Sequence, residues 1–232
     1  MALRGPRPRA PTGQLERQLR QAGFPRVAGA DEAGRGSLFG PVFAAAVILS
    51  PLRPVRGLRD SKQLSAARRE ELAARIRERA VSWAVAAVDA RVIDRINIYQ
   101  ASRLAMKQAL EKLDPPADHL LLDAMRVDLP LPQRAVIHGD ALCAAIAAAS
   151  ILAKVARDHA LCEWDAIYPQ YGLARHKGYP TAEHIRALAR YSPTLEHRFS
   201  YQPVEAATPR WLWWLCERRR PGGSGESGWL WR

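Results

Sequence analysis

The stretch VAGADEAGRGSLFGPV, residues 27–42, joins an acidic pair to a glycine-rich loop. Asp31 and Glu32 end a short apolar run that is compatible with a β-strand, and Gly34-Arg35-Gly36 follows them directly. Glycine and proline up to position 41 predict a loop, and residues 42–49 predict a returning strand. An acidic pair beside a basic, flexible loop indicates a metal site that faces a phosphate chain.

The two carboxylates constrain the first strand. Consecutive side chains of a regular strand point to opposite faces, so Asp31 and Glu32 could not both face one site. We therefore expect the strand to end or bend between them, which the glycines just downstream would allow.

Composition sets the bounds for the whole chain. With 232 residues, of which 48% are hydrophobic, and no repeat of fixed period, the chain is expected to build one main domain. The net charge of +12 favours a polyanionic partner, because clustered Lys and Arg release counterions from phosphate backbones. Charge alone is weak evidence, since arginine-rich composition can also reflect genomic bias.

Cysteine usage and hydropathy indicate the cellular compartment. The three cysteines are widely spaced and odd in number, which predicts neither a disulfide framework nor a zinc cluster and fits a reducing, cytoplasmic setting. No apolar run approaches the roughly 20 residues of a membrane helix, and no signal-peptide core is present at the N-terminus. We expect a soluble, intracellular protein without membrane association.

Three segments are expected along the chain. Residues 1–25 form a basic segment whose first dozen residues are expected to be disordered, with a short helix over Gln14–Gln21. Residues 26–204 form the main domain. Residues 205–232 are a Trp/Arg-rich tail that could be a docking helix, a stacking platform or a self-packed segment, and we favour self-packing of its first Trp cluster.

Hydrophobic periodicity predicts alternating strands and helices. The fully apolar run before Asp123 predicts a strand buried on both faces. A helix near 142–164 should bury Leu142, and residues 92–113 predict one or two helices joined near Asn97. The other expected strands cover 81–88 and 134–138, and the other expected helices cover 66–80, capped by Ser65, and 182–190.

Polar residues inside these elements have two interpretations each. Ser150, Lys154, Arg157 and Asp158 share one stripe of a small-residue-rich helix, facing either solvent or an active site. Residues 168–181 combine three tyrosines with basic side chains, which suits phosphates and flat sugars or bases, although an ordinary loop with surface aromatics has the same composition.

Carboxylates at the predicted element ends define the chemistry. A lone Asp123 after a buried strand is often only a turn former, but Asp31, Glu32, Asp123 and Asp140 together suit Mg²⁺ or Mn²⁺. Two such ions, about 3.5–4 Å apart, can support in-line phosphodiester cleavage. A paired-carboxylate glycosidase explains neither the positive charge nor the basic loops. No P-loop or G-x-S-x-G elbow occurs.

Several ordered motifs carry a family resemblance. They are GADEAGRGSLFGPV (29–42), DSK (60–62), LLDA (121–124), GD (139–140), AAASILAKVARD (147–158), YPQYG (168–172), HKGYPT (176–181) and HRFSYQPV (197–204). Across residues 27–204 the chain resembles bacterial ribonuclease HII, the type 2 ribonuclease H family. The resemblance implies a ribonuclease H-like α/β fold, in which helices flank a central mixed β-sheet and a helical C-terminal part lies beside the acidic site.

The resemblance also implies an activity and a set of site residues. The activity is endonucleolytic cleavage of RNA in RNA/DNA hybrids, including cleavage 5′ of single ribonucleotides in duplex DNA to leave 3′-hydroxyl and 5′-phosphate ends, by a monomer with Mn²⁺ or Mg²⁺. The metal-binding catalytic carboxylates would be Asp31, Glu32, Asp123 and Asp140. The ribose and junction phosphate would be read by Gly34, Arg35, Gly36 and Tyr179. Further candidates for phosphate or DNA-strand contacts are Lys62, Ser150, Lys154 and Lys177.

One departure and two alternatives accompany the resemblance. His138 stands where the family often has lysine, which could weaken a contact or make it pH-dependent. A catalytically silent hybrid-binding protein would keep the basic loops without needing the carboxylates. The type 3 ribonuclease H usually has an added N-terminal domain and mainly requires longer RNA tracts, so the short N-terminal segment here favours type 2.

Overall fold

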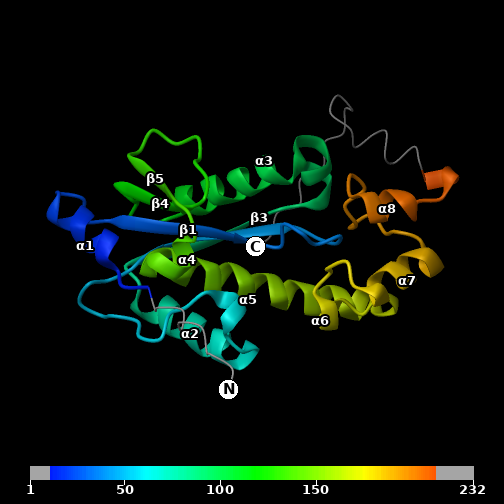
Figure 1. The fold of residues 1–232 in the computed structure, drawn as a ribbon, viewed down its shortest axis with the longest axis horizontal. Coiled ribbons are helices and arrows are strands. Elements are labelled where there is room, and N and C mark those ends of the chain that lie inside the picture. Colours follow the sequence, from blue (N-terminus) through cyan, green and yellow to red (C-terminus); the bar gives the residue numbers. More distant parts are fainter. Residues whose placement is uncertain (1–10, 213–232) are drawn as a thin grey trace, which may run out of the picture.

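The computed structural model describes residues 11–212, which form a mixed β-sheet with helices on both faces (Figure 1). The five described strands lie in the order β3-β2-β1-β4-β5. β1 lies at the centre, antiparallel to β2 and parallel to β4. The strands are β1 Val27–Ala33, β2 Val42–Ile48, β3 Ser82–Val88, β4 His119–Asp123 and β5 Gln133–Val136. The expected α/β fold is confirmed.

The helices divide into two layers and a C-terminal group (Figure 1). α3 covers one face of the sheet, α5 and α2 cover the other, and α6, α7 and α8 lie beyond the sheet near the C-terminal end of α5. The helices are α1 Gln14–Gln21, α2 Ala66–Arg79, α3 Ala90–Glu111, α4 Gly139–Leu142, α5 Ala144–Ile167, α6 Leu173–His176, α7 Ala182–Tyr191 and α8 Gln202–Ala206. Within residues 11–212, short 3₁₀ turns occur at Ser61–Gln63, Pro169–Tyr171 and Arg210–Leu212.

The small residues of β2 explain the layering. Alternate strand residues point to opposite faces, so Ala44 and Ala46 pack against α3 while Ala45 and Val47 pack against α5 and α2. All four are fully buried. Alanine on both faces lets the two helical layers approach the strand closely.

The helix breaks were predicted with unequal success. The expected interruption near Asn97 is confirmed, because Asn97 adopts φ 65° and ψ 164° inside α3. The helix expected from position 142 was wrong at its start: Cys143 is extended, with φ −110° and ψ 125°, so Leu142 belongs to α4 and is 53% exposed. The strand expected over 134–138 ends at Val136, since His138 turns into the left-handed region with φ 54°.

The two ends of the chain differ from each other. The predicted helix α1 is confirmed, and Oε1 of its buried Glu16 accepts a hydrogen bond from Ala145 N at 2.8 Å, in the first turn of α5. Self-packing was wrong for Trp211, which is 71% exposed. Residues 1–10 and 213–232, including the other tail tryptophans, lie outside the described residues. Among the helices described, none is both long and apolar enough to cross a membrane.

Candidate active site

The acidic pair lies where β1 loses one of its two neighbours. Parallel pairing with β4 ends at Ala30, opposite Leu122, whereas antiparallel pairing with β2 continues to Ala33. The expectation that the strand ends between Asp31 and Glu32 was therefore wrong, because β2 still holds both residues in the sheet. From Asp31 onward, β1 has no backbone pairing with β4. The next position on β4 is Asp123, so two carboxylates meet at the carboxyl ends of adjacent parallel strands, the usual place for a site in such sheets.

Burial and mutual repulsion perturb the acidic pair. Asp31 is 6% exposed, and burial followed by the charges of Glu32 and Asp123 raises its pKa well above the ordinary value. Burial also raises the pKa of Glu32, although Arg35 opposes this shift with its guanidinium 3.4 Å from Glu32 Oε1. Glu32 Oε2 is buried without a hydrogen-bond partner. Repelling carboxylates with an unsatisfied oxygen fit a cation that prefers oxygen ligands.

Asp140 joins this group from the turn after β5. Gly139 N donates a hydrogen bond to Asp123 Oδ1 at 2.8 Å, which ties α4 to the end of β4. Burial, and then the charges of Asp60 and Asp123, raise the pKa of Asp140. Sequence reasoning did not assign a role to Asp60, which begins the 3₁₀ turn by accepting a hydrogen bond from Lys62 N at 2.9 Å. Its place in the DSK motif was the available signal.

Two of the predicted substrate contacts lie next to the carboxylates. Burial opposes the charge of Lys62, but nearby acids raise its pKa overall, and these acids are Asp60, Asp140, Asp31 and Asp123. Ser150 is buried, its hydroxyl lies 3.0 Å from Ser61 Oγ, and the same hydroxyl opposes the rise in the pKa of Asp31. The structure therefore places Lys62 at the acidic group and Ser150 behind it.

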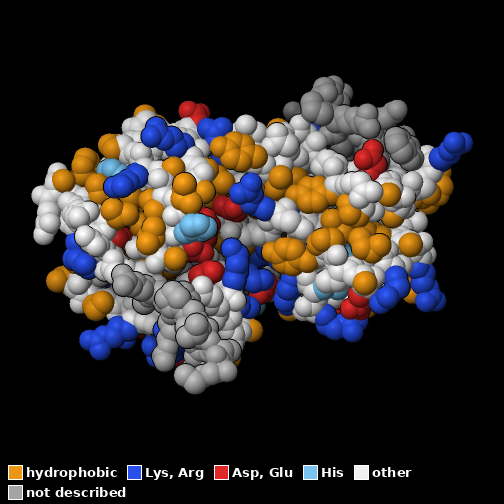
Figure 2. Space-filling view, viewed as in Figure 1, with side chains coloured by type: hydrophobic (Ala, Val, Ile, Leu, Met, Phe, Trp, Pro, Cys, Tyr) orange, Lys and Arg blue, Asp and Glu red, His pale blue; other side chains and the backbone are white. Residues whose placement is uncertain are grey.

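The donor set suits a hard divalent cation but is not closed around one. Among residues 11–212, no three His, Cys, Asp or Glu side chains form a ready-made cage for an ion. Mg²⁺ and Mn²⁺ do not require one, since such ions are held by a few carboxylates together with water and substrate phosphate. The residues that fit this role are Asp31, Glu32, Asp123 and Asp140. In Figure 2, acidic side chains near the centre of the face have basic side chains beside them.

The glycine loop, residues 34–36, is held from inside by two buried arginines. Gly34 has φ +98°, and a Cβ there would lie 2.2 Å from Arg157 Nε, so only glycine fits. Arg198 donates hydrogen bonds to the carbonyls of Gly34 at 2.8 Å, Arg35 at 2.9 Å and Gly40 at 2.9 Å. Both arginines are fully buried. Sequence reasoning missed their role, although Arg157 lies on the polar stripe and Arg198 in the HRFSY motif.

Tyr179 lies against the glycine loop, as expected. Its ring is 3.8 Å from the position of a Cβ on Gly36, and the tyrosine remains 38% exposed. The Arg157 guanidinium lies over the same ring at 5.2 Å from its centroid and donates to Lys177 O at 2.6 Å. The polar stripe of α5 therefore turns Arg157 into the protein rather than toward solvent.

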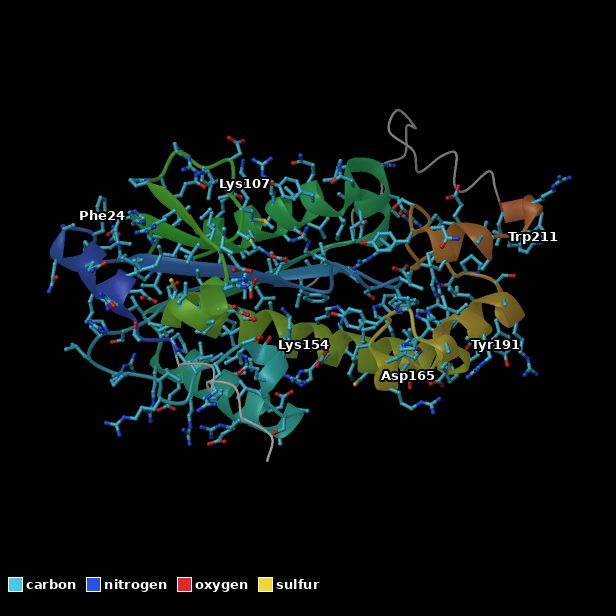
Figure 3. The ribbon with its side chains drawn as sticks, viewed as in Figure 1. Phe24, Lys107, Lys154, Asp165, Tyr191 and Trp211 are labelled. Atoms are coloured by element: carbon cyan, nitrogen blue, oxygen red, sulfur yellow. The ribbon has the colours of Figure 1, made fainter. Side chains whose placement is uncertain are left out.

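The remaining predicted contacts lie along α5 and the tyrosine-rich loop. Lys154, labelled in Figure 3 on the part of α5 that leads toward the C-terminal helices, has its ammonium 2.6 Å from Asp158 Oδ1. Lys177 Nζ lies 3.1 Å from Cys162 Sγ. Tyr171 is 1% exposed and packs in the C-terminal core, so the loop is not a continuous exposed aromatic platform.

Comparison with known proteins identifies the family. The model of the family described as Ribonuclease HII matches residues 28–204. The chain belongs to the ribonuclease HII family. It is 63% identical over 192 residues to ribonuclease HII of Solibacter usitatus, covering 83% of this chain and 84% of the relative. Ribonuclease HII of Koribacter versatilis is 53% identical over 197 residues, covering 85% of this chain and 78% of the relative.

Solved structures agree on the fold. Ribonuclease H2 from Pyrococcus horikoshii superposes with a TM-score of 0.66 at 24% identity, covering 78% of this chain and 96% of that one. The PCNA:RNase HII complex from Archaeoglobus fulgidus superposes with a TM-score of 0.65 at 25% identity, covering 79% of this chain and 97% of that one. Bst-RNase HIII in complex with Mn²⁺ superposes with a TM-score of 0.57 at 18% identity, covering 78% of this chain and 68% of that one. Family membership makes this ribonuclease a divalent-metal-dependent hydrolase that acts on RNA/DNA hybrids.

Proposed function

We propose that this ribonuclease HII cuts 5′ of single ribonucleotides embedded in duplex DNA, as well as the RNA strand of hybrids, and leaves 3′-hydroxyl and 5′-phosphate ends. The observation that carries the proposal is the position of Tyr179 against the glycine loop, directly after the acidic end of β1. The ribose 2′-hydroxyl is the group that distinguishes RNA from DNA at one nucleotide. A glycine loop lets backbone groups approach that hydroxyl closely.

The catalytic carboxylates of the proposal are Asp31, Glu32, Asp123 and Asp140, as ligands of Mg²⁺ or Mn²⁺. When bound, such ions would supply activation of a water and stabilisation of the leaving oxygen. The chain itself contributes acidic side chains whose repulsion favours cation binding. Hydrogen bonds from Gly139 N to Asp123, and from Glu32 N to Asp31, fix the direction of two of these carboxylates.

The basic residues are proposed to hold the substrate. Arg35, 45% exposed at its side chain and paired with Glu32, can turn from that partner to a phosphate. Lys62 lies among the carboxylates. Lys154 on α5, and Lys177 at the end of α6 with its ammonium beside Cys162 of α5, would contact the DNA strand. Because Ser150 is buried, we assign it to orienting Asp31. We further propose that residues 26–204 are the catalytic domain and that the chain acts as a monomer.

Cleavage of a DNA duplex that contains one ribonucleotide tests this function. With Mg²⁺ or Mn²⁺ we expect a single cut on the 5′ side of the ribonucleotide, and no cut with EDTA or in the matched all-DNA duplex. End-labelled products compared with synthetic markers identify the 3′-hydroxyl and 5′-phosphate ends. Binding without metal-dependent cleavage would support the silent hybrid-binding protein. Cleavage restricted to long RNA tracts would support type 3 specificity.

A further inference from the structure

A group of histidines lies directly behind Tyr179. His184, in the first turn of α7, has its Nδ1 3.1 Å from Tyr179 O and its Nε2 3.2 Å from His197 Nε2. His184 and His197 are both fully buried. The ring of His176 stacks on that of His184, with 4.6 Å between centroids. The backbone of Tyr179 is therefore linked to side chains that never reach solvent.

The hydrogen bonds fix one tautomer for each ring of this pair. Thr194 N–H can only donate, so His197 Nδ1, at 2.9 Å, must accept, which leaves the His197 proton on Nε2. That proton points to His184 Nε2, which must therefore accept. The His184 proton then lies on Nδ1 and is donated to Tyr179 O. We call this chain, from Thr194 through His197 and His184 to Tyr179, the histidine relay.

The hydrogen bonds of the relay can all form only when both histidine rings are neutral. A second proton on His184 would place two N–H groups against each other at the 3.2 Å contact with His197. Burial, and then the charge of His176, lowers the pKa of His184 to about 4. Burial also lowers the pKa of His197 well below its usual value. Both rings therefore remain neutral at physiological pH, as the relay requires.

The segment that carries His197 also holds the glycine loop. Phe39 forms an isolated antiparallel bridge with His197, and Arg198 N donates to Leu38 O at 2.9 Å. The Arg198 side chain reaches the carbonyls of Gly34 and Arg35. Adjacent residues of one segment thus contact both sides of the site: His197 toward Tyr179 and Arg198 toward the glycine loop. Their spacing along the backbone sets the distance between those two sides.

We propose that His184 and His197 are positioning residues, which hold Tyr179 at the distance from the glycine loop that discriminates a single ribonucleotide. The proposal rests on the proposed function of Tyr179 and deepens it. The histidines do not touch substrate. They act through one hydrogen bond to the Tyr179 carbonyl, while Arg157 supports the face of the ring.

Two substitutions of His184 separate its hydrogen bond to Tyr179 O from its contact with His197. In His184→Asn the amide nitrogen lies near the place of Nδ1 and can still donate to Tyr179 O. In His184→Gln the amide lies near the place of Nε2, keeping the contact with His197 and losing the donor to Tyr179. The readout is the kcat/KM for a single-ribonucleotide duplex divided by the kcat/KM for a duplex with a continuous RNA tract. Both values come from one preparation, so the ratio does not depend on the folded fraction.

We expect His184→Asn to keep this ratio within about twofold of the wild type, and His184→Gln to lower it by about 5- to 10-fold, the effect of one lost hydrogen bond. In a Tyr179→Ala background, His184→Gln should lower the ratio no further, because both changes act through Tyr179. Equal ratios in the Asn and Gln variants, or independent losses in the double variant, would overturn the relay alone. A wild type that does not cut the single-ribonucleotide duplex would defeat the proposed function and, with it, the relay.

A spectroscopic test does not depend on activity. In ¹⁵N-histidine NMR spectra of the full chain near neutral pH, we expect His184 to carry its proton on Nδ1 and His197 on Nε2. Single variants of each histidine assign the signals. The opposite tautomer at either ring would overturn the relay.

The buried histidines also predict how stability depends on pH. Because the pKa of His184 falls from 6.5 in the unfolded chain to about 4 in the folded protein, the unfolded chain binds more protons between these values. The free energy of unfolding should therefore fall as the pH drops from 6.5 to about 4. The groups that face His184 are the rings of His176, His197 and Tyr171, the carboxylate of Glu183 and the backbone of Tyr179 and Gly178.

Urea unfolding at several pH values checks this dependence. We expect the wild type to lose stability more steeply over that pH range than His184→Asn does, since the asparagine does not titrate. The variant shares every other titrating group, including the acidic site, so the difference between the two curves reports His184 together with its coupling to His176 and His197. Parallel curves would contradict the prediction.

Discussion

Asp31→Asn is expected to lower the rate of cleavage by at least about 100-fold while leaving binding of the RNA/DNA duplex within a few-fold of the wild type. The substitution keeps the shape of the side chain, and its carbonyl oxygen can still accept the hydrogen bond that Asp31 Oδ1 receives from Glu32 N at 2.8 Å. It removes the negative charge that a divalent cation requires. Rates with Mg²⁺ and with Mn²⁺, and binding in EDTA, measure the two effects separately.

The same variant is expected to be more stable than the wild type when metal is absent. Burial and the charges of Glu32 and Asp123 raise the pKa of Asp31, which means that its ionised form is disfavoured in the folded protein. Asparagine removes this penalty. In turn, Mn²⁺ should raise the melting temperature of the wild type more than that of the variant, because bound metal stabilises the folded state.

Asp128→Asn is the matched control, since the same substitution there alters a side chain that is 92% exposed. It should change neither cleavage nor the response to Mn²⁺. If Asp31→Asn cuts at the wild-type rate, Asp31 is not a metal ligand in this ribonuclease. If it loses activity but is no more stable without metal, repulsion within the acidic group is not a significant cost in the folded protein.

The end of β4 was predictable because a strong local pattern marks it. The continuous apolar run that ends in Asp123 can be recognised from the local sequence alone, and so can the acidic pair before the glycine loop. The pairing order of the strands could not be read in this way. It decides that β1 loses β4 but keeps β2 at Asp31, which is why the strand does not end between Asp31 and Glu32.

The support behind the site depends on contacts between distant parts of the chain. Arg198 and Gly34 are 164 positions apart, and no local pattern shows that an arginine in HRFSY points inward. The same holds for His184 and His197, whose alternation with charged neighbours resembles an ordinary surface. Their burial depends on three-dimensional packing around Tyr171 and Phe39. Motif reasoning could propose residues that meet substrate, but it did not show which residues hold them in place.

Gly29→Ala is expected to have the largest effect on stability, lowering the free energy of unfolding by about 3 kcal/mol or more. Gly29 lies on β1, where the strand crosses the first turn of α5. A Cβ there would lie 2.2 Å from the carbonyl carbon of Ala145 and 2.3 Å from Ile146 N. These are backbone atoms, so no side chain can rotate away, and the strand and helix must separate. Urea and thermal unfolding measure the loss.

Gly36→Ala is the control, because the nearest atom to its added Cβ is 3.8 Å away, which is an ordinary contact. Its stability should stay within about 1 kcal/mol of the wild type, the usual cost or gain of exchanging glycine and alanine. Ala145→Gly should not rescue Gly29→Ala, since it removes the methyl group of Ala145 and leaves the backbone atoms in place. Rescue would show that side-chain crowding, rather than the approach of β1 to the helix backbone, requires glycine. Because Asp31 lies on the same face two residues farther along β1, the approach that requires Gly29 also sets how close Asp31 comes to Ser150 on α5.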